Sequence, residues 1–182
     1  MKTSIRTLCL LAGATVLSPL ALAEKSAFTK GPVIEEFGEN VAVKSDLKIP
    51  LDTEFKVAFD IGEAGKNDKP SRSLNTAARF INMHARAGIP ADQISVAIVV
   101  HGSAYKDLLK SDFYDTSKST QNPSISLINA LLEQNTKIYL CGQTAAYYGV
   151  TKEKLLPGVE LSLSAMTAHA LLQQDGYTLN PF

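Results

Sequence analysis

The best candidate for chemistry in the sequence is Cys141, which follows a short apolar segment, 137–140, typical of a buried strand. Gly142-Gln143-Thr144 then leads into a short helical segment. A thiol at a helix start lies near unpaired backbone N–H groups, which favour the nucleophilic thiolate. Gly142 lets the backbone turn closely and leaves room above the sulfur. A cysteine at a strand end can equally be a small residue that fills space, so a reactive and a packed thiol both stay open.

Polar residues also follow three other apolar segments, and they begin at Asp60, His101 and Ser162. Histidine titrates near neutral pH, so His101 could orient or protonate a group on Cys141. It could equally cap the sheet by hydrogen bonding to a loop. The candidate catalytic residues are therefore Cys141 and His101, and the candidate ligand-binding residues are Asp60, Gly102, Gly142 and Gln143.

The remaining polar candidates favour structural roles. We expect Asp60 to hold the 62–65 loop by accepting backbone N–H bonds. His84 and His169 lie within predicted helices, where we expect surface or packing positions.

Two further kinds of site are disfavoured. The stretch 62–66 resembles a phosphate loop, but a P-loop has four residues between its glycines and a Ser or Thr after the lysine. Here two residues separate the glycines and Asn67 follows the lysine. No paired-ligand spacing supports a metal site at His101 and Cys141. We therefore expect no cofactor and no metal.

The elements that must position these residues alternate along the chain. Apolar runs predict strands at 55–60, 94–100, 137–140 and 159–163, with a short edge strand at 177–179. Helical spacing predicts helices over 74–85, over a segment capped by Asn122 with Pro123 in its first turn, and over 165–174.

Alternating strands and helices predict a mostly parallel sheet covered on both faces. The predicted fold class is α/β, a three-layer α/β/α sandwich of flavodoxin-like topology. In such sheets, ligands bind at the carboxyl ends of the strands, which is where the candidate residues lie.

The first 23 residues have the layout of a secretory signal peptide. Lys2 and Arg6 precede an apolar stretch, 8–22, and Ala21-Leu22-Ala23 fits a small-x-small cleavage site. We expect a cleaved, periplasmic protein with an N-terminal arm at 24–53, loosely patterned as a hairpin, and one domain at 54–182. No other segment is long and apolar enough to anchor it in a membrane.

Charge and cysteine content narrow the function further. Cleavage would remove two basic residues from a chain with 18 basic and 18 acidic ones. The slightly acidic product lacks the basic face that nucleic-acid binding needs. Cys9 would leave with the signal, so Cys141 could form no disulfide within its own chain.

Several short motifs, in this order, resemble the DsrE/DsrF-like family, in particular its exported members. The motifs are Val57-Ala58-Phe59-Asp60, Leu74-Asn75, Val99-Val100-His101-Gly102-Ser103-Ala104, Leu140-Cys141-Gly142-Gln143, Leu156-Pro157-Gly158-Val159, Ser164-Ala165-Met166, Leu171-Leu172-Gln173 and Gly176-Tyr177. The resemblance covers most of residues 28–182. It implies a three-layer α/β/α fold and homo- or hetero-oligomers, and for this chain we expect a homo-oligomer.

Cytoplasmic members of this family pass sulfur along relays as a cysteine persulfide. The resemblance therefore implies that Cys141 bears sulfur, with His101 beside it and a thiol or a sulfane-sulfur small molecule as partner. One alternative is a non-catalytic oligomeric protein that binds a small ligand, with Cys141 only packed. Another is thiol-based hydrolysis or redox sensing, for which His101 is the one plausible base.

Overall fold

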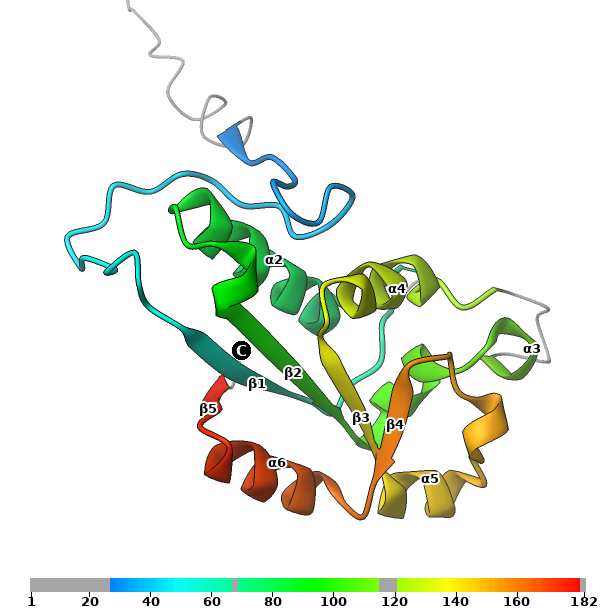
Figure 1. The fold of residues 1–182 in the computed structure, drawn as a ribbon. Coiled ribbons are helices and arrows are strands. Elements are labelled where there is room, and N and C mark those ends of the chain that lie inside the picture. Colours follow the sequence, from blue (N-terminus) through cyan, green and yellow to red (C-terminus); the bar gives the residue numbers. More distant parts are fainter. Residues whose placement is uncertain (1–26, 67–68, 115–120, 181–182) are drawn as a thin grey trace, which may run out of the picture.

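The computed structural model describes residues 27–66, 69–114 and 121–180, so the predicted signal peptide lies outside the described residues. Its centre is a five-stranded sheet with the order β4-β3-β2-β1-β5 (Figure 1). All neighbouring strands run parallel. The strands are β1 (Phe55–Ile61), β2 (Ile94–Val100), β3 (Lys137–Cys141), β4 (Val159–Ser162) and β5 (Thr178–Asn180).

Helices cover both faces of the sheet, which confirms the three-layer α/β/α sandwich (Figure 1). On one face lie α2 (Arg72–Arg86) and α4 (Ile125–Glu133), and on the other lie α5 (Gly142–Tyr148) and α6 (Ala165–Gln174). A short helix, α3 (Ser111–Tyr114), and 3-10 segments such as Gly102–Leu108 complete the described elements. The edge strand next to β1 is β5, the last strand in the chain, whereas the flavodoxin order has the second strand at that edge.

The two faces of the sheet have different cores. Val57, Phe59 and Ile61 of β1 join the larger core, beneath α2 and α4. Ala58 points the other way, into a smaller core with Ala97, Val99, Ala168, Leu172 and Tyr177. Because successive strand residues face opposite sides, Asp60 shares the α6 side with Ala58. The small side chains of this core let α6 approach the sheet closely.

The predicted start of helix α4 is displaced by two residues. The helix begins at Ile125 with Ser124 as its N-cap residue, so Pro123 precedes the first turn instead of lying in it, and the Ser124 side chain makes no capping hydrogen bond. Asn122 does make the side-chain bond of a cap, since its oxygen accepts from the Ser124 N–H at 2.9 Å. Its amide also donates to the carbonyls of Asp107 (2.8 Å) and Leu109 (2.6 Å).

The N-terminal arm forms no two-stranded hairpin over its described residues. A single antiparallel bridge joins Thr29 and Asn40. The backbone of the arm instead bonds to side chains, since Asn82 of α2 accepts from the N–H of Ile34 (2.8 Å) and donates to the carbonyl of Phe37 (2.9 Å). The arm is thereby fixed over α2.

Among the helices that the structure describes, none combines the length and the apolar character that a bilayer crossing needs.

Candidate functional site

Cys141 ends β3 and is the N-cap residue of α5. It is a free thiol and only 6% exposed. Burial alone would raise the pKa of this thiol, but four hydrogen-bond donors act against it. They are the N–H groups of Thr144, Ala165 and Gln143 and the hydroxyl of Thr144, and together they bring the pKa of Cys141 below its usual value. The sulfur therefore lies between the first turns of α5 and α6, where negative charge is stabilised.

The turn after Cys141 packs tightly on the loop between β4 and α6. A Cβ at Gly142 would lie 2.5 Å from the carbonyl oxygen of Ser162 and 3.1 Å from that of Leu163, so only glycine fits without a shift. The Gln143 side-chain amide donates to the Leu163 carbonyl at 3.2 Å. These two predicted binding residues thus hold the loop beside the thiol.

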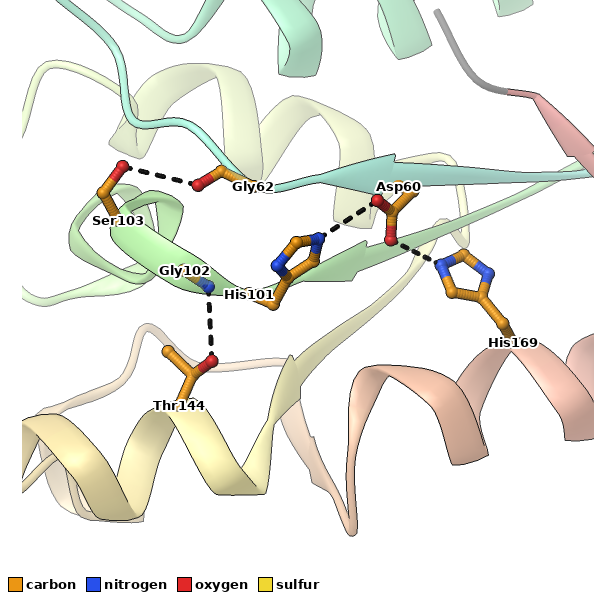
Figure 2. Close-up of polar contacts among 7 residues, drawn as sticks. All are labelled: Asp60, Gly62, His101, Gly102, Ser103, Thr144 and His169. Carbon is orange, nitrogen blue, oxygen red and sulfur yellow. Dashed lines mark hydrogen bonds and ion pairs between the residues drawn. The ribbon is translucent and has the colours of Figure 1, made fainter.

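Thr144 joins the thiol to the end of the neighbouring strand. Its Oγ1 accepts from the Gly102 N–H at 3.2 Å, as Figure 2 shows, and its hydroxyl is also a donor for the Cys141 sulfur. In the register of β2 and β3, Val100 lies opposite Leu140. His101 directly follows Val100, and Cys141 directly follows Leu140. The prediction that these two strand ends lie at the same edge of the sheet is therefore confirmed.

Three side chains form a cluster on the far side of β2. The Asp60 carboxylate bridges two imidazoles, with Oδ2 3.0 Å from Nε2 of His101 and Oδ1 2.7 Å from Nε2 of His169 (Figure 2). Burial alone would raise the pKa of Asp60, but the hydrogen bonds and charges of His101 and His169 lower it below its usual value. The carboxylate is therefore ionised at neutral pH and accepts from both rings.

This cluster sets how His101 can act on the thiol. Asp60 is on β1 and Cys141 is on β3, on opposite sides of β2. The His101 ring is hydrogen-bonded toward β1, so its Nε2 faces away from the thiol. A hydrolase in which His101 Nε2 directly deprotonates Cys141 does not fit this geometry.

The predicted role of Asp60 in holding the 62–65 loop is wrong. A different carboxylate holds that loop: Oδ2 of Asp107 accepts from the Gly65 N–H at 2.9 Å. Asp107 is buried and also accepts from the Ser124 hydroxyl at 2.7 Å. Burial raises the pKa of Asp107 despite these two hydrogen bonds.

His169 is the site residue that sequence reasoning missed. The prediction of a packing residue is correct for His84, which is buried against Phe55 and Phe80. It is wrong for His169, which contacts Asp60 from α6. No local sequence signal marked it, because the contact joins residues that are 109 positions apart.

An open groove of about 460 Å³ runs along β3, β4 and α6, and Cys141 is not among its lining residues. Leu161, Leu163 and Leu171 line it and are 40%, 72% and 60% exposed. Among the described residues, no group of three or more His, Cys, Asp or Glu side chains is arranged to hold a metal ion.

The sequence profile of the DsrE/DsrF-like family matches residues 56–181. Two solved structures of similar fold are MTH1491, a protein of unknown function from Methanobacterium thermoautotrophicum, and the ychN protein from E. coli. MTH1491 shares 19% identity at a TM-score of 0.51, and the ychN protein shares 17% at 0.52. Each alignment covers 70% of this chain and 99% of the other. No curated protein is a significant match to the sequence.

Proposed function

Because the chain belongs to the DsrE/DsrF-like family, a family of sulfur-relay proteins in general, we propose that Cys141 carries sulfur as a persulfide. The observation that supports this proposal most is the set of donors around the thiol. Backbone N–H groups from the starts of two helices and one hydroxyl outweigh the effect of burial and lower the pKa of Cys141. A thiolate is the form that attacks sulfane sulfur.

The loading step needs no external oxidant. The Cys141 thiolate attacks the outer sulfur of a donor such as thiosulfate. A new S–S bond forms to Sγ while the S–S bond of the donor breaks, and sulfite leaves with the bonding electron pair. The product is a Cys141 persulfide anion. The donors at the starts of α5 and α6 stabilise the Sγ thiolate before the attack, and in the product the charge lies on the outer sulfur, one S–S bond away from them.

Intact-mass analysis tests this proposal. The full chain carrying Cys9→Ser, so that Cys141 is its one thiol, is incubated with thiosulfate or polysulfide and then mapped by peptide. We expect the mass of one added sulfur, on Cys141 and removed by a reductant. The matched control Cys141→Ser takes up none. Unmodified Cys141 at a pH where the same thiol is alkylated would exclude the proposal.

We further propose that the protein acts as a homo-oligomer. The support is the exposed apolar surface along the edge strand β4 and helix α6, formed by Leu161, Leu163, Met166 and Leu171. Contiguous exposed apolar side chains often mark a protein–protein contact. Light scattering on the full chain should give a multiple of the chain mass, and Leu163→Lys should lower it. A monomeric wild-type chain would contradict this.

Export to the periplasm is the proposed location, and it depends on cleavage after Ala23. The N-terminal sequence of the protein purified from a Gram-negative host tests it. The expected sequence begins at Glu24, and a periplasmic fraction should contain the shortened chain. Retention of residues 1–23 on a cytoplasmic protein would contradict the proposal.

A further inference from the structure

The contacts of the Asp60 carboxylate show which ring nitrogen carries a hydrogen in His101 and in His169. A carboxylate accepts hydrogen bonds and cannot donate them. Each Nε2 that contacts it, on His101 at 3.0 Å and on His169 at 2.7 Å, must therefore carry a hydrogen. In the neutral ring, the other nitrogen, Nδ1, is then an unprotonated acceptor.

The surroundings of the His169 ring and of the Asp60 carboxylate agree with this assignment of the hydrogens. Nδ1 of His169 is buried and has no hydrogen-bond partner among the described residues. A bare acceptor tolerates such a position better than an N–H group does. The lowered pKa of Asp60 agrees as well, because the carboxylate stays ionised and keeps accepting at neutral pH.

The His101 ring is held in place but is not enclosed. It lies against Gly62, where an added Cβ would be 2.9 Å from Cε1 of the ring. Its side chain is 38% exposed, so solutes can reach it. The next residue, Gly102, is bonded through Thr144 to the thiol site. The ring therefore stands at the solvent edge beside Cys141 in a fixed orientation.

Returning sulfur from Cys141 to an acceptor thiol requires a proton to move, whereas loading does not. The persulfide leaves loading as an anion, and its outer sulfur is a poor electrophile until it is protonated. The acceptor thiol, in turn, must lose its proton before it attacks. One group that accepts a proton from the acceptor and delivers it to the outer sulfur would serve both needs.

We propose that His101 is this proton shuttle and that Asp60 and His169 are the residues that position it. The inference rests on the proposed persulfide function. The proton passes from the acceptor thiol to Nδ1 of His101 and on to the outer sulfur of the Cys141 persulfide. The acceptor thiolate then attacks that sulfur, a new S–S bond forms, the bond to Sγ breaks, and its electron pair leaves Cys141 as a thiolate. Overall, one thiol and one persulfide anion become one persulfide and one thiolate.

Titratable groups face the ring from several elements. Asp60 comes from β1, His169 from α6 and Cys141 from the end of β3. The loop that packs on the ring at Gly62 also carries Glu63 and Lys66, which pair with each other at 3.5 Å, and the 3-10 segment after His101 carries Lys106 and Asp107. Loading requires only the Cys141 thiolate, whereas unloading also requires the proton transfer through His101, so a defect confined to unloading identifies the His101 step.

The experiment measures loading and unloading separately in the full chain carrying Cys9→Ser. Thiosulfate loads Cys141, excess donor is removed, and glutathione is added as the acceptor thiol while intact mass is followed across pH. Asp60→Asn should slow unloading about tenfold more than it slows loading. It should also change the dependence of the unloading rate on pH relative to wild type. Asp175→Asn, the same chemical change at an exposed aspartate paired with Lys56 and Lys137, is the control.

The outcomes separate the two proposals. No sulfur on Cys141 in any variant overturns the persulfide function itself. Normal loading with the unloading rate and pH profile of wild type in Asp60→Asn overturns the shuttle alone. If Asp60→Asn does not fold, as judged by circular dichroism, His101→Gln takes its place and must show the same selective defect. Restoration of the wild-type pH profile by Asp60→Glu would support a positioning role over a purely structural one.

Discussion

Cys141 and Asp60 lie at the carboxyl ends of two strands of the same sheet, separated by β2, and negative charge is favoured on each side chain in a different setting. The thiol is 6% exposed, and most of its donors are backbone N–H groups at helix starts. The carboxylate is 38% exposed, and its donors are two imidazoles. The first setting depends on how closely the backbone packs. The second depends on the identity of three side chains, so substitutions should affect the two regions in different ways.

The largest effect should come from closing the space at Gly142. Gly142→Ala puts a Cβ against the carbonyls of Ser162 and Leu163 and should lower the free energy of unfolding by about 3 kcal/mol. Gly149→Ala is the matched control. Its φ of 64° strains any side chain, but the space around it is open, so we expect a loss of about 1 kcal/mol. Equal losses in urea unfolding would show that the turn is not tightly packed.

Thr144 is the one side chain whose hydroxyl contributes to the setting of the thiol. Thr144→Val should raise the pKa of Cys141 and slow its alkylation at neutral pH by up to about tenfold. Thr144→Ser should restore the rate. The control is Thr178→Val on β5. It removes a hydroxyl that donates to the Lys56 carbonyl of β1, and it should leave the alkylation rate of Cys141 unchanged. A wild-type rate in Thr144→Val would mean that the backbone donors alone determine the pKa.

Substitutions of the two helical histidines, His84 and His169, should affect different properties, the first stability and the second sulfur unloading. His84→Gln removes a ring packed on Phe55 and Phe80 and should cost about 1 kcal/mol of stability without altering sulfur unloading. His169→Gln should change stability less and slow unloading by about threefold, because the amide still donates to Asp60 but orients it less well. The reverse pattern would assign His169 to packing.

The smallest effect should be on stability in acid. The pKa of Asp60 is lowered by folding, so its contribution to stability is present above the ordinary carboxylate pKa and is lost as pH falls through the folded value. The stability difference between wild type and Asp60→Asn should therefore shrink below about pH 4. Thermal unfolding across pH measures it, and a difference that persists in strong acid would contradict the ionised bridge.

The sequence predicted the sheet well because its signals are local. Continuous apolar runs marked β2 and β3, and the predicted last helix, 165–174, has the observed bounds of α6. Parallel strands end at one edge, so the grouping of Asp60, His101 and Cys141 also followed from the strand pattern. The start of α4 was predicted two residues early, because Asn122 makes the side-chain bond of a cap while the helix itself begins at Ile125.

The partners of Asp60 lay beyond local reasoning. Asp60 and His169 are 109 residues apart, and their contact requires α6 to cross the sheet over the alanines of the smaller core. Sequence alone likewise could not place Asp107, rather than Asp60, under the 62–65 loop. In both cases, tertiary packing determines which of several similar side chains makes the contact. The spacing of apolar residues along the sequence does not contain that information.

The most direct test of the account is the pH dependence of Cys141 alkylation in the folded Cys9→Ser chain, compared with glutathione under the same conditions. The lowered pKa predicts that the rate reaches half its maximum at a lower pH than that of glutathione. A midpoint at or above that of glutathione, or alkylation that occurs only when the protein unfolds, would show a packed thiol and contradict the central claim.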